Sequence, residues 1–219
     1  MALFAVRLWL PDRPGMLAAV ATRIAAMRGN VVGLEVLERE GGIAVDELTV
    51  ELPHDGMIDQ MCNQIRLVEG AGVEDVRPVR ADDEERGLQV MSAALAILET
   101  TNSAAALSAL MGYAGELFEL DWATLVDLRS GVHVQSVGDV PTVAWLTAFA
   151  EGARADGADA CTDRSGVLAE ELESSGLTLY VGRPVPFRRR ERREVEMLAR
   201  VTDRVRAALE PGPAVHPRW

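Results

Sequence analysis

Residues 3–17, LFAVRLWLPDRPGML, change their hydrophobic period part-way along the stretch. Phe4, Val6 and Leu8 lie at every second position, which is typical of a strand that packs one face against a core. Beyond Pro14 the apolar residues are spaced three or four apart, which predicts one buried face of a helix. Pro14 is expected in the first helical turn and Gly29 at the end of the helix. The predicted helical stripe is Leu17, Val20, Ile24 and Met27.

The rest of the first half extends this pattern to the order βαββαβ. Residues 30–40 and 43–52 read as two strands, and Gly41-Gly42 between them is typical of a hairpin turn. A second helical stripe follows, and residues 73–79 read as a short fourth strand. This order predicts a ferredoxin-like fold, with an antiparallel sheet and both helices on one face.

The apolar pattern of the third predicted strand changes phase in its middle. Ile43 and Val45 are out of phase with the apolar residues from Leu48 onward. An extra residue in a strand would produce such a shift, so we expect a β-bulge at Asp46 and Glu47.

A charged stretch divides the chain into two halves. Residues 80–87, RADDEERG, contain no large apolar side chain, which is typical of a linker. We therefore predict a first domain, a linker, an α+β second domain and a tail. Their bounds are residues 1–80, 81–87, 88–210 and 211–219.

The second domain is predicted to contain helices and strands in alternation. Two helices come first, and Ser103 is the expected N-cap of the second of them. Strands are expected at residues 122–128 and 132–137, with a further helix and strand after them. A long final helix begins near residue 188 with interleaved arginines and acids. That run indicates a solvated helix face or, alternatively, a site for an anionic group.

Composition and charge exclude several partners and chemistries. The 219 residues carry a formal net charge of −12, which disfavours nucleic acid or an anionic membrane as a partner. All 22 basic residues are arginines, so neither a Schiff-base lysine nor a P-loop lysine is present. No stretch approaches the roughly 18 apolar residues that span a bilayer, and no signal peptide is recognised, so we expect a cytoplasmic location. Cys62 and Cys161 form no CxxC pair and are expected to be ordinary thiols.

No catalytic or metal-binding motif is recognised in the sequence. His54, His133 and His216 have no second ligand at metal-binding spacing. Motifs of the GxSxG, HExxH and Walker types are absent. We therefore predict that the protein is not an enzyme and that it has no catalytic residues, cofactor or metal.

The turn DRPGML at residues 12–17 and the sequence RGN at residues 28–30 resemble the ligand-binding motif of ACT domains. ACT domains are regulatory modules of amino-acid metabolism, and the resemblance covers about residues 4–79. In members that bind amino acids, the loop after the first strand and an asparagine opening the second strand hold the effector, usually at an interface between two domains. The resemblance implies an amino-acid site that comprises Asp12, Arg13, Pro14, Gly15, Met16 and Asn30.

The chemistry of these residues agrees with such a site. Gly15 has no Cβ to obstruct a ligand, and the start of the helix suits a carboxylate. Asp12 could accept hydrogen bonds from an ammonium group, and Asn30 can both donate and accept. ACT domains of the phosphoglycerate dehydrogenase type have His and Asn where this chain has Leu10 and Asp12, which argues against serine as the effector.

A purely structural interpretation of the same residues stays open. Asp12 could be only the helix N-cap, Gly15 a packing glycine and Asn30 a turn residue. In that case the domain would keep its fold for dimerisation and bind no effector.

The second half is similar to a GAF domain, an α/β domain with a central antiparallel sheet. The similarity rests on the stretch DWATLVDLRSG at residues 121–131 and on the late strand that runs through PF into the final helix. The Asn-Lys-Phe-Asp-Glu signature of cyclic-nucleotide GAF domains is absent. The two resemblances together predict a non-enzymatic sensor that binds a small molecule, an amino acid above all, as a homodimer. The alternative is a dimerisation or protein-interaction scaffold in which neither domain binds a ligand.

Overall fold

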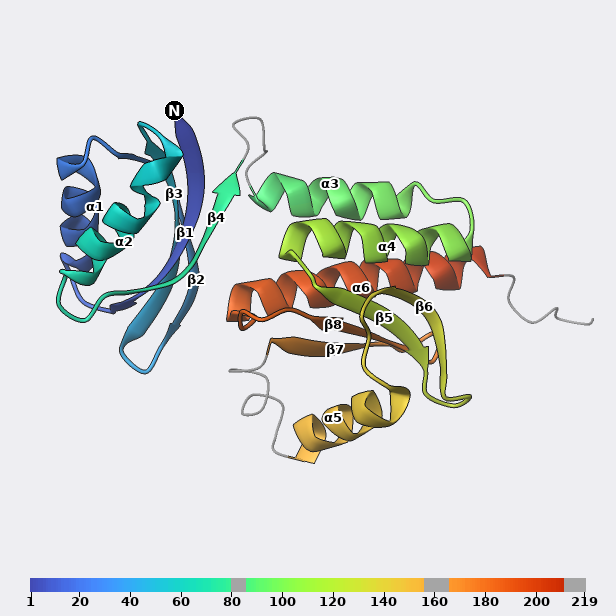
Figure 1. Cartoon of the computed structure of the whole chain (residues 1–219). Coiled ribbons are helices and arrows are strands. Elements are labelled where there is room, and N and C mark those ends of the chain that lie inside the picture. The colour runs from blue at the N-terminus through green and yellow to red at the C-terminus, as the bar shows by residue number, and fades with distance from the viewer. Residues whose placement is uncertain (80–85, 156–165, 211–219) are drawn as a thin grey trace, which may run out of the picture. The chain divides into compact units, whose positions relative to one another are not determined.

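The computed structural model describes residues 1–79, 86–155 and 166–210, which form two compact units (Figure 1). The first unit has the predicted βαββαβ order, with a single 3-10 turn, η1 (Asp55–Met57), before its second helix. Its elements are β1 (Ala2–Pro11), α1 (Met16–Ala26), β2 (Asn30–Glu40), β3 (Ile43–Leu52), α2 (Ile58–Arg66) and β4 (Gly72–Val79).

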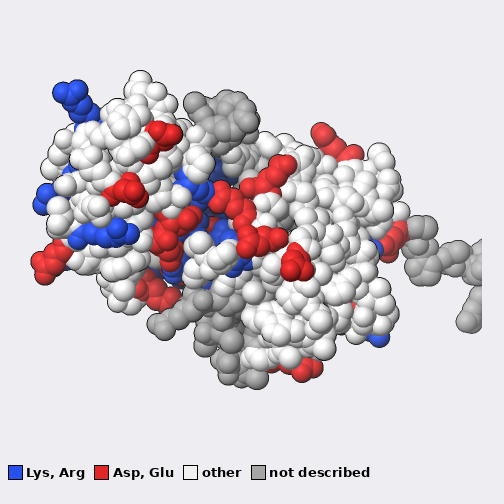
Figure 2. Space-filling model, viewed as in Figure 1, with Lys and Arg blue, Asp and Glu red and all other residues white. Residues whose placement is uncertain are grey.

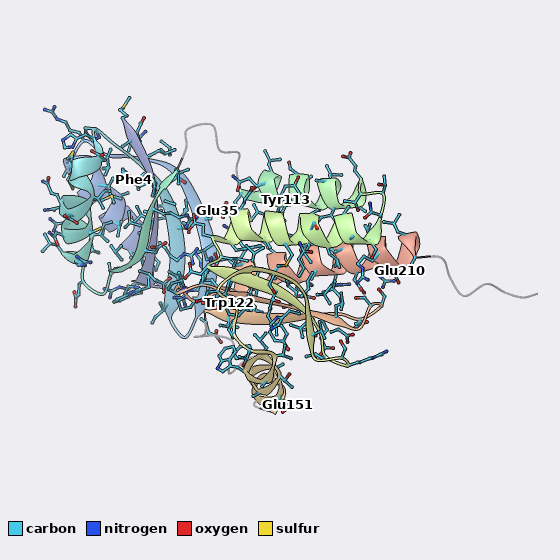
Figure 3. The ribbon with its side chains drawn as sticks, turned by 45° about the vertical axis from the view of Figure 1, so that its right-hand side comes forward. Phe4, Glu35, Tyr113, Trp122, Glu151 and Glu210 are labelled. Carbon is cyan, nitrogen blue, oxygen red and sulfur yellow. The ribbon has the colours of Figure 1, made fainter. Side chains whose placement is uncertain are left out.

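The four strands of the first unit form one antiparallel sheet in the order β2-β3-β1-β4. β1 and β3 pair without a break over ten residue pairs, from Ala2 opposite Leu52 to Pro11 opposite Ile43. α1 and α2 cover one face of this sheet, the face on which Phe4 is labelled in Figure 3. The core between helices and sheet includes Phe4, Val6, Leu8, Leu10, Val20, Ile24, Leu48, Val50, Leu52, Met61 and Ile65.

The expected bulge at Asp46 and Glu47 is wrong, because β3 stays in register with β1 through both residues. The neighbouring strand β2 has two register shifts against β3, one between Val31 and Gly33 and one, opposite Asp46, between Val36 and Glu38. The apolar pattern changes phase because β3 has buried residues on both faces of the sheet. Leu48 faces the helices, whereas Val45 and Glu47 point to the opposite face.

The charged residues on the face of the sheet opposite the helices form an ion-pair cluster around the buried carboxylate of Glu47. Glu47 accepts hydrogen bonds from Arg7 at 3.0 Å and from Arg77 at 2.8 Å. Burial alone would raise the pKa of Glu47, but the two arginines outweigh it and hold that pKa below its ordinary value. The carboxylate is therefore ionised in the sheet and paired on both oxygens.

Both ends of α1 differ from the prediction. The helix begins at Met16 with Gly15 as its N-cap, so Pro14 precedes the helix instead of lying in its first turn. At the other end the left-handed residue is Arg28, with φ 62°, and not Gly29. Gly29 is needed for space, because a Cβ there would lie 2.8 Å from the Ile24 side chain.

The second unit also follows the predicted alternation of helices and strands. Its elements are α3 (Arg86–Leu98), α4 (Ser103–Phe118), β5 (Trp122–Asp127), β6 (Val132–Gly138), α5 (Val143–Ala155), β7 (Val167–Leu172), β8 (Leu177–Gly182) and α6 (Arg189–Leu209). The strand β7 was not predicted. Arg86 and Gly87, at the end of the predicted linker, are the first residues of α3, and the rest of the linker and the tail lie outside the described residues. The N-cap of α4 is Asn102 and not Ser103, because the Asn102 side chain accepts the Ala105 N–H at 2.8 Å.

The sheet of the second unit is antiparallel, in the order β6-β5-β8-β7, and helices cover both of its faces (Figure 1). The larger core lies between the sheet and α3, α4 and α6; among its fully buried members are Ile97, Leu110, Phe118, Leu125, Phe187 and Leu198. α5 packs on the other face, where Leu146 and Ala150 contact a cluster with Val126 and Tyr180.

The acidic residues at the start of α6 are buried in an ionic network, so they do not form the solvated face that was expected. Glu191 has no exposed surface and accepts a hydrogen bond from Arg183 at 2.6 Å. Glu194 accepts one from Arg86 at 2.9 Å, and the same arginine lies 3.7 Å from Glu191. The network therefore joins the start of α3, the end of β8 and the start of α6.

Replacing Glu191 with Gln should destabilise the second unit strongly, because Arg183 would be left without its full counter-charge in a buried position. We expect a loss of about 3 kcal/mol in the free energy of unfolding, measured by urea denaturation. The control is Glu196→Gln, which removes the exposed 3.5 Å pair with Arg200 and should change the same quantity by about 0.5 kcal/mol or less. Equal effects of the two substitutions would contradict the assigned role of Glu191.

Glu170 of β7 is a half-buried carboxylate, and the charges that act on its pKa are those of other carboxylates. It lies opposite Leu179, on the face of the sheet that packs against the larger core. Burial, followed by the charges of Glu196 and Glu171, raises the pKa of Glu170 to about 7. Its carboxyl group is therefore protonated in the folded protein at pH values where it is ionised in the unfolded chain.

Stability should consequently fall as the pH rises from about 4.5 to 7, because the folded state binds the extra proton across that window. Glu170→Gln should remove this contribution, so the variant should be more stable than the parent above pH 7 by about 1–3 kcal/mol. The measurement is the pH dependence of the melting temperature from pH 5 to 8. Glu173→Gln, in the exposed turn after β7, is the control and should keep the parent profile.

Candidate ligand-binding loop

The loop between β1 and α1 is attached to the β2–β3 hairpin. The Asp12 N–H donates to the Gly42 carbonyl at 2.8 Å, and the Arg13 N–H donates to the Pro11 carbonyl at 2.8 Å. Gly41 and Gly42 both have positive φ, at 58° and 80°, as a two-residue hairpin turn requires. These contacts hold the loop at one end of the sheet, against the tight Gly41-Gly42 turn of the hairpin.

Gly15 gives the loop its shape and opens it to solvent. Its φ of 91° is in the left-handed region that favours glycine, and no heavy atom lies within 4 Å of a Cβ built at this position. Gly15 is therefore not a packing glycine. It is also the N-cap of α1, and no side chain caps this helix, which excludes Asp12 as the cap. The first N–H groups of α1 thus have no side-chain acceptor at an open surface.

The other predicted loop residues divide into exposed and buried members. Asp12, Arg13 and Pro14 are exposed, and Asp12 Oδ1 lies 3.8 Å from Nε of Arg39 on β2. Met16 is only 8% exposed and belongs to the core, although its sulfur accepts a hydrogen bond from Arg13 Nε at 3.4 Å. Met16 can therefore contribute its backbone or one edge of its side chain, but not a fully accessible surface.

Asn30 does not lie beside this loop within one chain. It is exposed at the start of β2 and pairs with Glu51, whereas the loop follows Pro11, which pairs with Ile43 at the other end of β3. α1, with 11 residues and a length of about 16 Å, spans the distance between the two ends. One chain alone therefore does not bring Asn30 and the loop together.

Asp46 is a polar residue near the loop that the sequence did not mark as a site residue. It is 5% exposed and lies on the helix-covered face of the sheet, between Leu8 of β1 and Val36 of β2. Its Oδ1 is buried and has no hydrogen-bond partner among the described residues. Burial raises the pKa of Asp46; the charge of Arg39 opposes this rise and that of Asp12 adds to it. The one sequence signal for this residue is that it occupies a position of β3 where the alternating pattern would place a buried apolar side chain.

No group of His, Cys, Asp or Glu suited to a metal ion occurs in the part of the chain that the structure describes. His133 contacts the Thr124 hydroxyl at 2.9 Å, Cys62 is a buried free thiol, and Cys161 and His216 lie outside the described residues. No helix within residues 1–79, 86–155 and 166–210 is long and apolar enough to cross a membrane.

The surface charge of the second unit agrees with the acidic composition. In the view of Figure 2 the charged side chains over this unit are mostly acidic, and broad uncharged areas lie between them. These acidic side chains are consistent with the formal net charge of −12.

Comparison with known proteins relates the first unit to one family. Residues 4–66 match the sequence model of the ACT domain. No curated protein matches the chain. Similar solved structures include the ACT domain of GTP pyrophosphokinase from Chlorobium tepidum, at 19% identity with a TM-score of 0.28, covering 36% of this chain and 97% of that one. An unknown protein from Galdieria sulphuraria is 14% identical with a TM-score of 0.32, and the match covers 94% of this chain and 92% of that one.

The family match and the fold support the same assignment for the first unit. The matched residues run from β1 to the end of α2, and the whole unit has the βαββαβ order that the sequence predicted. Residues 4–66 are accordingly assigned as an ACT domain, which suggests a regulatory role that involves binding a small molecule.

Proposed function

We propose that this chain is a non-enzymatic regulatory protein that binds an amino acid at the β1–α1 loop of its ACT domain. The observation that carries the proposal is the uncapped start of α1, where Gly15 is left-handed and open space adjoins its Cα. Such a helix end offers N–H donors and a positive dipole to an anionic group. An amino acid supplies that group as its carboxylate.

The side chains of the loop suit the other end of an amino acid. The Asp12 side chain is 40% exposed, and among the described residues its carboxylate forms an ion pair with Arg39 at 3.8 Å. An exposed pair of this kind is weak, so a ligand ammonium group can replace Arg39 at little cost. The loop thus presents donors for a carboxylate and an acceptor for an ammonium group on adjacent residues.

Asn30 would complete the site if two copies of the chain paired through β2. β2 is an edge strand, so one side of its backbone has no strand partner among the described residues. A two-fold axis through an antiparallel β2–β2 pair carries Asn30 of one copy to the Glu40 end of β2 in the other. That end adjoins the hairpin to which Asp12 is bonded.

The side chains of β2 support such a homodimer. Val32, Leu34 and Val36 are 53%, 46% and 38% exposed, although they are large and apolar. An exposed apolar edge strand is a template for pairing with another strand. A second copy supplies a strand of identical pattern, and the proposed assembly is therefore a homodimer with two composite sites.

The second unit is proposed to be a GAF-like domain, and the protein to be cytoplasmic. A four-stranded antiparallel sheet with helices on both faces supports the GAF-like assignment. The sequence lacks the signatures of nucleotide-binding and hydrolytic enzymes, and this supports the proposal of a non-enzymatic role.

A second candidate function, a dimerisation or protein-interaction scaffold, is favoured by an apolar stripe on α3. Leu88, Met91, Leu95 and Leu98 follow a three-four-three spacing, and each is between 51% and 60% exposed. This is the spacing of a helix that packs along another helix. A groove lined by Leu98, Met197, Arg200, Val201 and Arg204 lies between this stripe and α6.

Binding of an amino acid should raise the melting temperature of the full chain. A ligand at about a hundred times its Kd adds about 2.7 kcal/mol, which corresponds to several degrees. The measurement is a thermal-shift screen against the twenty common L-amino acids. Asp12→Ala and Asn30→Ala should each abolish the shift, whereas Asn63→Ala, on the exposed face of α2, should preserve it.

Mixing the two inactive variants tests the composite site. In a dimer of Asp12→Ala with Asn30→Ala, one of the two sites has an intact loop from one copy and an intact Asn30 from the other. In calorimetry on the mixture, we therefore expect each mixed dimer to bind one ligand at its one intact site, which is half the number of sites of the parent dimer. No recovery would contradict the composite site, and no shift with any amino acid would contradict the proposed function.

Charge placed on β2 should separate the two copies. Leu34→Lys should convert the dimer to a monomer in sedimentation velocity, because it would place two like charges diagonally across the apolar strand pair. Leu67→Lys, at an equally open position with 61% exposure beyond α2, should leave the dimer intact. If Leu95→Lys separates the copies and Leu34→Lys does not, the dimer forms through the α3 stripe and the scaffold function is favoured.

A further inference from the structure

Asp46 is a carboxylate in a position that the fold would fill with an apolar side chain. The positions before and after it on the same face of β3 are Ala44 and Leu48, which are 5% and 0% exposed. Leu8, directly opposite on β1, is also fully buried. A carboxylate in this row is removed from most of its water by its neighbours.

The carboxylate is also incompletely paired. Oδ1 accepts no hydrogen bond from any residue in the described ranges. A buried acceptor without a donor is costly, and in folded proteins such groups are rare. Glu47, the next residue, shows the usual solution in this same sheet, because Arg7 and Arg77 satisfy both of its oxygens.

The position of Asp46 connects it to the β1–α1 loop. Arg39 on β2 pairs with Ala44, so it lies on the same face of the sheet as Asp46 and one row nearer the loop. The same Arg39 lies 3.8 Å from Asp12. α1 starts beyond the loop and runs back over this face of the sheet (Figure 1). From the loop toward the core, the order is therefore Asp12 in the loop, then Arg39 in the adjacent row of the sheet, then the buried Asp46 one row further in.

We propose that Asp46 is the buried specificity residue of this loop and that it recognises a primary ammonium group. A ligand –NH₃⁺ has three N–H donors, one of which supplies the missing partner of Oδ1 while another reaches Asp12. Pairing with a cation also offsets the cost of the buried charge. The inference rests on the proposed function and narrows it, because 2-hydroxy acids and 2-oxo acids, which lack the ammonium group, would be rejected.

The test compares three classes of probe on the full chain: the twenty L-amino acids, their 2-hydroxy acid counterparts and their decarboxylated amines. For the parent protein we expect an amino acid to bind and its hydroxy acid to bind far more weakly. Asp46→Asn should lower the affinity for that amino acid about ten- to a hundredfold and reduce its preference over the hydroxy acid. The free variant should melt at the same temperature as the parent or higher, because a buried unpaired charge has been removed.

The control is Asp59→Asn, the same change at an exposed carboxylate in the first turn of α2, which should change neither affinity nor preference. If Asp46→Asn binds the amino acid as tightly as the parent, or melts lower than the parent, the role of Asp46 is overturned while the proposed function stands. If only the decarboxylated amines bind, and Asp46→Asn abolishes that binding, the amino-acid function fails and the role of Asp46 stands. If no probe binds, both fail.

Discussion

The unbroken pairing of β1 with β3 is the constraint on which the rest of the first unit depends. Side chains alternate between the two faces of a sheet, so a slip of one residue would exchange the faces along the whole strand. Ten successive pairs hold Leu8 and Leu48 toward the helices and Arg7 and Glu47 away from them. The same register ends β1 beside the hairpin, which is why the Asp12 N–H meets a hairpin carbonyl.

Features that cost stability gather at this end of the sheet. Gly15 is left-handed, α1 has no side-chain cap, and Asp46 is buried with an unpaired oxygen. Elsewhere the chain satisfies the same needs in ordinary ways, as Asn102 does by capping α4. Locally unfavourable choices that coincide in space are typical of a functional site, because selection for binding opposes selection for stability. Their coincidence supports the proposal that this loop binds a ligand.

Both units use the same arrangement to bury a carboxylate. Glu47 in the first unit and Glu191 in the second each contact two arginines. Arginine suits this role, since its planar group donates several hydrogen bonds in a fixed geometry and stays charged. Removing one partner from such a group leaves an uncompensated charge, so each network tolerates little change. Asp46 and Glu170 lack this arrangement, and the pKa of each is raised by burial.

The sequence alone determined the order of elements in the first unit and the place of the loop, whereas it missed strand β7 of the second unit. The period of the apolar residues, the Gly-Gly hairpin and the Pro-Gly turn are local signals. They predict the elements correctly because each depends on residues that are close together in the chain. Tertiary structure decided what depends on residues far apart in the chain: the register shifts on β2 instead of a bulge on β3, the burial of Glu191, and the separation of Asn30 from the loop. It also decided that Asp46 is buried without a full set of partners, because strand pairing and helix packing, and not the residue type, remove water from a side chain.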